Sequence, residues 1–159
     1  MSNSFAHVHR VTMEVGGKTC TFRSKLEYRW AVWCQLRKEQ GIIKEWWFEA
    51  HDTLLELETA YFKNRKLYLP DFTIQTADGY EFEETKGYFP PKDYTKIKLA
   101  AMQYENPITL IFANLCANSK NSKTRAQYGR AKRLEPFLKR VIFNAERDIF
   151  RKIKGLFEI

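Results

Sequence analysis

LYLPDFTIQTADGYEFEETKG, at residues 67–87, alternates apolar and polar side chains on either side of Asp78-Gly79. Alternation with a period of two residues is typical of a β-strand that is apolar on one face. An Asp-Gly pair between two such runs favours a tight turn, because glycine readily adopts the positive φ angles that the turn requires. The stretch is therefore predicted to form a β-hairpin.

Charged side chains extend the apolar face of this hairpin. Glu84 and Lys86 follow the aromatic residues of the second run at intervals of two, so they share the aromatic face. A two-residue turn at the Asp-Gly pair would place Asp71 opposite Lys86. Thr73 would then lie opposite Glu84. The predicted hairpin thus brings two carboxylates and a lysine together at one end.

Two interpretations of these charges remain open. In the first, Asp71 and Lys86 form a cross-strand ion pair and Glu84 is solvated. In the second, the carboxylates bind a cation, because like charges are costly to bury side by side unless something neutralises them. Carboxylate oxygens are the ligands that Mg²⁺ and Mn²⁺ prefer, and such an ion can activate water for attack on a phosphate.

Helices and further strands are expected around the hairpin. Residues 24–27 read Ser-Lys-Leu-Glu, the form of a capping box, and predict a helix that ends at Gly41. The other predicted elements are a hairpin at 11–22, one or two strands within 42–57, a helix at 90–104, a buried strand at 108–113 and an amphipathic helix at 135–153. This order predicts an α/β (α+β) fold with a mixed β-sheet flanked by helices.

The composition describes a folded, basic protein. The 159 residues, 44% of them hydrophobic, are enough for one domain with a buried core. The net charge of +8 favours a polyanionic partner, nucleic acid before membrane. The cysteines fit no disulfide framework or zinc motif, no apolar run could span a membrane, and the first residues lack a signal-peptide pattern. We expect a cytoplasmic protein.

Two motifs resemble those of known nucleases. Pro70-Asp71, followed by Glu84-Thr85-Lys86, resembles the signature of the PD-(D/E)xK nuclease superfamily. FRSKLE, at residues 22–27, resembles the helix start of the bacteriophage endonuclease I type of Holliday junction resolvase. The resemblance implies a restriction-endonuclease-like fold.

The resemblance covers the chain in part. It spans a catalytic core at about 22–113, without a counterpart for the first 21 residues or for an insertion at about 50–64. An N-terminal hairpin at about 8–23 and a basic segment with a C-terminal helix at about 119–157 would complete a single domain of residues 1–159.

The resemblance also implies a role for each residue of the motifs. Asp71 and Glu84 would bind Mg²⁺ (or Mn²⁺), with help from the Thr85 backbone carbonyl. Lys86 would position or activate the attacking water, and Glu27 would complete the catalytic site. From the sequence alone, Glu27 can equally be the last residue of its capping box, with a hydrogen bond back to the first amide of that box.

A basic segment at residues 119–133 is predicted to bind the DNA backbone. It contains no acidic residue, and its polar side chains are of the kinds that share phosphate contacts with arginine and lysine. A solvated surface run is the alternative interpretation. The predicted DNA-binding residues are Arg23, Lys120, Lys123, Arg125, Arg130, Lys132 and Arg133.

The charge and the motif residues, together with the resemblance, predict a metal-dependent DNA endonuclease. The resemblance implies branched DNA or a Holliday junction as its substrate. If the protein is phage-encoded, the bacterial cytoplasm would be its place of action. The alternatives are a transposon-end or other phage nuclease with a different DNA substrate, and a DNA-binding module without activity. Because two symmetric cuts require two sites, we expect a homodimer. Its interface could use the N-terminal hairpin, which could exchange between protomers. It could also use the surplus apolar residues of the helix predicted at 137–157, namely Phe137, Val141, Phe143, Phe150 and Phe157.

Overall fold

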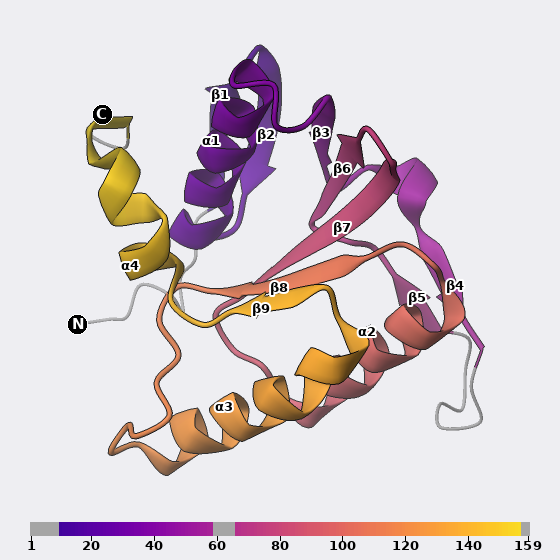
Figure 1. The fold of residues 1–159 in the computed structure, drawn as a ribbon, viewed down its shortest axis with the longest axis vertical. Coiled ribbons are helices and arrows are strands. Elements are labelled where there is room, and N and C mark those ends of the chain that lie inside the picture. The colour runs from indigo at the N-terminus through magenta and orange to yellow at the C-terminus, as the bar shows by residue number, and fades with distance from the viewer. Residues whose placement is uncertain (1–9, 59–65, 157–159) are drawn as a thin grey trace.

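A mixed five-stranded sheet forms the centre of the computed structural model, which describes residues 10–58 and 66–156 (Figure 1). Across the sheet, β3, β6 and β7 are antiparallel neighbours, whereas β7, β8 and β9 run parallel. In this order the strands are Glu45–Phe48, Phe72–Thr76, Gly79–Lys86, Ile108–Phe112 and Arg140–Ile142. The predicted fold with a mixed sheet flanked by helices is confirmed.

Helices cover both faces of this sheet (Figure 1). On one face lie α1 (Lys25–Glu39) and the hairpin of β1 (Val11–Val15) and β2 (Lys18–Phe22). On the other lie α2 (Pro91–Gln103) and α3 (Ser122–Leu134). These two helices share a face because they connect successive parallel strands, and such crossovers have one hand. None of the described helices is long and apolar enough to cross a membrane.

Alternation along the strands divides the core between the two faces. Ile111 and Ile142 pack in the cluster beneath α1, whereas Leu110 and Val141 pack in the cluster beneath α2 and α3. β7 carries charge in the same alternating arrangement. Its Glu83 contacts α1. Glu84 lies on the opposite face of the strand, the face that packs against α2 and α3.

A buried ion pair joins α1 to the sheet. The Arg37 guanidinium donates to the two carboxylate oxygens of Glu83 at 2.9 and 2.6 Å. Trp30 Nε1 donates to the same carboxylate at 2.8 Å. A buried carboxylate is tolerated where its charge is paired and its oxygens are hydrogen-bonded, and both conditions hold here.

The N-terminal hairpin and the helix start agree with the sequence prediction. The turn between β1 and β2 is formed by Gly16 and Gly17, with φ angles of 58° and 83°. Ser24 is the N-cap of α1, and its Oγ accepts a hydrogen bond from the Glu27 amide at 3.1 Å. The predicted helix at 90–104 and the buried strand at 108–113 are α2 and β8.

The predicted strands within residues 42–57 are β3 and β4 (Leu55–Leu57), with a short 3₁₀ helix at His51–Thr53 between them. β4 pairs with β5 (Lys66–Tyr68) in a separate two-stranded sheet. The first run of the predicted hairpin is therefore split into β5 and β6. Pro70 lies at the break, where its missing amide hydrogen removes no bond from a central strand.

The predicted hairpin register is wrong by two residues. Thr76 pairs with Gly79, so Thr73 lies opposite Phe82 instead of Glu84. The Thr76 hydroxyl donates to the Gly79 carbonyl and accepts from the Asp78 amide, both at 3.1 Å, and this side chain sets the turn one residue earlier than expected. A shift of two leaves each side chain on its predicted face.

The predicted helix at residues 135–153 is also wrong. The segment contains a 3₁₀ turn (Glu135–Phe137), strand β9, a short helix α4 (Ala145–Asp148) and the start of a 3₁₀ helix (Phe150–Leu156). Pro136 and the N-cap Asn144 interrupt the helical pattern, and the apolar residues between them pair with β8. Pairing with a buried strand thus overrides the local periodicity.

This correction also removes the interface expected on that helix. Val141 and Phe150 are buried, and Phe143 packs against the core beneath α2 and α3. Phe137 is 42% exposed, with Lys98 Nζ 4.8 Å from its ring centroid. Phe157 lies outside the described residues. The homodimer therefore stays a prediction without this support.

Removing the cation of the buried pair is expected to destabilise the fold strongly. Arg37→Ala leaves the Glu83 charge buried without its partner, which costs about 3–5 kcal/mol. Urea unfolding followed by circular dichroism measures the change. Lys132→Ala is the matched control, because its ion pair with Glu135 is exposed and its loss is expected to leave stability nearly unchanged. Equal effects of the two variants would contradict this account of the pair.

Candidate metal centre

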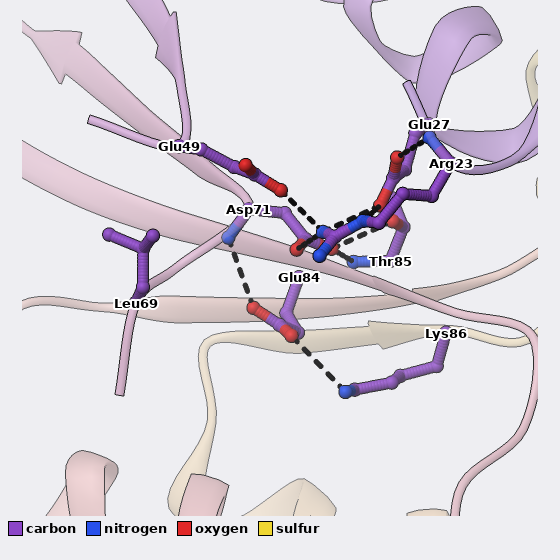
Figure 2. Close-up of a pocket in the computed structure, with 8 residues that line it drawn as sticks. All are labelled: Arg23, Glu27, Glu49, Leu69, Asp71, Glu84, Thr85 and Lys86. Atoms are coloured by element: carbon purple, nitrogen blue, oxygen red, sulfur yellow. Dashed lines mark hydrogen bonds and ion pairs between the residues drawn. The ribbon is translucent and has the colours of Figure 1, made fainter. Parts of the chain in front are cut away.

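A polar pocket lies where the start of β6 meets the end of β7, beside the N-terminus of α1 (Figure 2). β6 and β7 are antiparallel, so residues before β6 and residues late in β7 reach the same end of the sheet. The lining residues are Arg23, Glu27, Glu49, Leu69, Asp71, Glu84, Thr85 and Lys86. The hairpin thus brings together the charged residues that the sequence predicted at its end.

Backbone and side-chain donors of the hairpin hold the two predicted carboxylates in place. Asp71 Oδ2 accepts hydrogen bonds from the Thr85 amide at 2.9 Å and from the Thr85 hydroxyl at 2.8 Å. Glu84 Oε1 accepts from the Asp71 amide and from the Tyr68 hydroxyl, both at 3.1 Å. Each carboxylate is therefore fixed by groups of the neighbouring strand segment.

Lys86 reaches the same pocket, but its ion-pair partners differ from the partner that the first interpretation of the sequence gave it. Its Nζ lies 3.3 Å from Glu84 Oε2 and 3.1 Å from Asp93 Oδ2 of α2. The first interpretation paired Lys86 with Asp71, but among the described residues Lys86 pairs with Glu84 and Asp93. Glu84 is also buried instead of solvated. The purely structural interpretation of the three charges is wrong in this form.

Glu27 combines the two roles that the sequence left open. Its amide is capped by Ser24, as in a capping box. Its carboxylate, however, accepts from the Arg23 amide at 2.6 Å instead of returning to Ser24. It also points into the pocket, toward Asp71 (Figure 2). The cap explains the serine, whereas the Glu27 carboxylate bonds to Arg23 at the pocket.

Glu49 is a pocket residue that the sequence analysis missed. It follows β3, and its amide donates to the Asp71 carbonyl at 2.8 Å, which continues the pairing of β3 with β6. Its φ of 50° lies in the left-handed region, which costs a residue with a side chain about 1–2 kcal/mol. The pairing of two strands distant in sequence brings Glu49 beside Asp71, and no local motif marks that pairing.

Three of these carboxylates lie close enough together to hold a metal ion. One oxygen each of Glu27, Glu49 and Asp71 lies within 4.8 Å of the others, and we call these residues the carboxylate triad. Carboxylate oxygens suit Mg²⁺, Mn²⁺ and Ca²⁺. Glu84 and Thr85 line the same pocket, and their predicted metal contacts stay predictions.

The charges in the pocket also fit a bound cation. Four carboxylates line it against two cationic side chains, so negative charge is in excess when all are ionised. Burial, together with the charge of Glu84, raises the pKa of Asp71 well above its usual range. Burial raises the pKa of Glu84 as well, although the nearby Lys86 opposes the shift. A divalent cation would favour the charged forms of these carboxyls, which burial disfavours.

Arg23 lines the pocket, with a side chain that is partly exposed to solvent. Its Nη2 is 3.0 Å from Glu27 Oε1, 2.5 Å from Glu49 Oε1 and 3.5 Å from Asp71 Oδ1. The guanidinium is therefore the counter-ion of the carboxylate triad in this structure (Figure 2). The predicted DNA contact of Arg23 would require it to leave these partners.

The other predicted DNA-binding residues lie on or just before α3. Five of them are exposed, namely Lys120, Lys123, Arg125, Lys132 and Arg133. Arg130 is partly buried, and its Nε donates to the Phe89 carbonyl at 3.0 Å. Gln127 Oε1 accepts from the Phe89 amide at 2.8 Å. These two bonds join α3 to the segment that follows Lys86, so the basic helix lies beside the chain leaving the pocket.

Comparison with protein-family models finds no matching family, and comparisons with curated proteins and with solved structures find no match either. The resemblance to the PD-(D/E)xK superfamily therefore rests on the motif residues of this chain.

The raised pKa of Asp71 predicts a pH-dependent stability change. The folded state holds the Asp71 proton more tightly than the unfolded chain does, so wild-type stability falls as pH rises from the ordinary value of 3.8 through the raised pKa. Asp71→Asn avoids this loss. In EDTA, the variant is expected to have a higher free energy of unfolding than wild type at pH 7 to 8, with the difference disappearing toward pH 4.

Chemical unfolding at several pH values measures this difference. Asp148→Asn is the matched control, because Arg147 lowers the pKa of that exposed carboxyl, and its substitution is expected to bring no gain at neutral pH. An Asp71→Asn variant that is less stable than wild type at pH 8 would contradict the prediction.

Proposed function

We propose that the protein is a metal-dependent DNA endonuclease of the PD-(D/E)xK type, which hydrolyses phosphodiester bonds. The observation that carries the proposal is the convergence of Glu27, Asp71, Glu84 and Lys86 in one pocket, where three carboxylates can hold a metal ion. The net charge of +8 suits a polyanionic substrate.

The proposed cofactor is Mg²⁺ or Mn²⁺, held by the carboxylate triad together with Glu84 and the Thr85 carbonyl. The ion supplies a Lewis acid that activates water and balances charge on the phosphate. The hydrogen bonds from Thr85 and Tyr68 orient the carboxylates before any ligand arrives. Such fixed geometry lowers the reorganisation required during the reaction.

Lys86 is proposed to position the attacking water and to stabilise negative charge in the transition state. Its ammonium is held between Glu84 and Asp93, which keeps it at the pocket. Burial opposes the charged form, but Glu84 and Asp93 outweigh that effect and raise the pKa of Lys86. The lysine is therefore a cation at neutral pH, which favours electrostatic stabilisation and positioning over proton removal.

α3 is proposed to contact the DNA backbone. Exposed cations lie on this helix and just before it. The helix is anchored through Arg130 and Gln127 to Phe89, which is three residues after Lys86. Phosphate contacts of this kind position DNA without reading its sequence.

Branched DNA remains the proposed substrate, and a homodimer the proposed active form, because a junction needs two symmetric cuts. A transposon-end or other phage nuclease is the second candidate. The intact Asp71, Glu84 and Lys86 favour both over a DNA-binding module without activity. Cleavage of linear, flapped and four-way DNA of equal length, in Mg²⁺ and in EDTA, distinguishes these candidates.

Neutral substitutions in the motif are expected to abolish cleavage while preserving DNA binding. Asp71→Asn, Glu84→Gln and Lys86→Ala remove transition-state stabilisation, and each should lower the single-turnover rate by at least about 10²-fold. Asp78→Asn is the matched control, because this exposed carboxylate lies in the hairpin turn. Cleavage by the Asp71 variant at the control rate would refute the proposed mechanism.

Neutralising the exposed cations of the α3 region is expected to weaken binding to all DNA sequences alike. A fourfold alanine variant at Lys120, Lys123, Arg125 and Arg133 should flatten the log–log salt dependence of affinity by up to about 0.9 per lost phosphate contact. Arg130 is left in place because it holds the Phe89 carbonyl.

A second fourfold alanine variant serves as the control for this measurement. It removes exposed cations from the C-terminal part of the described chain, namely Arg140, Arg147, Arg151 and Lys152. If both variants flatten the slope equally, or neither does, the assignment of α3 as the DNA-binding helix is wrong.

A further inference from the structure

A single guanidinium nitrogen contacts the whole carboxylate triad. Arg23 Nη2 is 3.0 Å from Glu27, 2.5 Å from Glu49 and 3.5 Å from Asp71. Arg23 Nε adds a second bond to Glu27 Oε1 at 3.2 Å. The same three residues are those whose oxygens could hold a metal ion. Arg23 therefore contacts one oxygen of each carboxylate that a divalent cation would need.

The guanidinium and a divalent cation exclude one another at this position. A divalent ion bound by these three carboxylates would lie about 2.0–2.6 Å from their oxygens. Arg23 Nη2 stands in that space, because it is 3.0, 2.5 and 3.5 Å from one oxygen of each carboxylate. Two cations held by the same three carboxylates also repel each other strongly in a partly buried pocket. Metal binding thus requires the Arg23 side chain to leave.

The surroundings of Arg23 allow its side chain to leave while the backbone stays fixed. Phe22 is 1% exposed, and Ser24 is the N-cap of α1, so both neighbours are anchored. The Arg23 amide is held by Glu27 Oε2 at 2.6 Å. The side chain itself is 46% exposed, which leaves it a route to solvent. A rotation of this side chain alone would clear the triad.

We propose that Arg23 is a phosphate-binding residue that the carboxylate triad holds in the metal-free protein and that a divalent cation releases. Released at the mouth of the pocket, the guanidinium meets the phosphate that approaches the carboxylates, and it can bind two phosphate oxygens at once. Cation and DNA both favour the released state, so each increases the affinity for the other. The phosphate step rests on the proposed nuclease function, whereas the competition with metal does not.

The competition is tested by Mn²⁺ titration of the free protein, followed by electron paramagnetic resonance. Arg23→Gln is expected to bind Mn²⁺ on the order of tenfold more tightly than wild type, since one set of charge-assisted bonds no longer has to break. Lys86→Gln is the matched control for this measurement, because it removes one positive charge from the same pocket without touching the triad. Arg147→Gln controls for charge loss elsewhere.

Two outcomes would overturn the competition. Equal Mn²⁺ affinities for Arg23→Gln and wild type would show that the guanidinium does not block the metal. An equal gain in Lys86→Gln would show that the general field of the pocket explains the effect. Arg23→Lys, which keeps a cation but has only one nitrogen, is expected to be intermediate and provides a second folded variant.

The coupling to phosphate is tested with a short duplex that carries phosphorothioate linkages to resist cleavage. Fluorescence anisotropy gives its affinity with and without Mn²⁺. The gain on adding Mn²⁺ is expected to be larger in wild type than in Arg23→Gln, by a factor on the order of five to ten. Equal gains would overturn the release of Arg23 to phosphate.

These measurements separate the inference from the proposed function. Wild-type protein that cleaves DNA, with no change in Mn²⁺ affinity for Arg23→Gln, would retain the nuclease and remove the role of Arg23. Tighter Mn²⁺ binding by that variant, in a protein that cleaves no DNA, would retain the competition and remove the nuclease.

Discussion

The ion pair between Arg37 and Glu83 is the constraint on which the pocket depends. Glu27, Trp30, Cys34 and Arg37 recur at intervals of three and four residues, so they form one stripe along α1. Arg37 and Trp30 bind Glu83 of β7, which fixes the rotation of that stripe against the sheet. Glu27, at the beginning of the stripe, is thereby aimed at the end of the sheet where Asp71 lies.

Glu83 and Glu84 are neighbours in β7, and their side chains lie on opposite faces of the sheet in different electrostatic surroundings. Glu83 is buried with a matched cation and hydrogen bonds on both oxygens, and it stabilises the contact with α1. Glu84 is buried beside Asp71, and burial raises the pKa of both carboxyls. The charges of Asp71 and Glu84 therefore repel each other at the pocket, whereas the charge of Glu83 is paired with Arg37. Such an energetic cost is typical of sites that bind a ligand.

Patterns within short segments predicted much of this structure, because those segments are governed by their own residues. The glycine turn of β1 and β2, the Ser24 cap, α2 and β8 are of this kind, and so is the convergence of Asp71, Glu84 and Lys86. Two of the errors arose where distant segments decide. Pairing with β8 makes β9 a strand despite its helical periodicity, and pairing of β3 with β6 brings Glu49 to the pocket. The hairpin register depended on one hydroxyl, that of Thr76.

The backbone at Glu49 has a consequence for engineering of this chain. Its φ of 50° is a conformation that glycine and asparagine adopt more readily than glutamate. A sequence redesign guided by backbone preference alone would replace Glu49, gain stability and remove one carboxylate from the triad. The improvement in folding would conceal the loss, because the pocket would keep its shape. Thermal stability is therefore a misleading criterion for accepting substitutions at this end of β3.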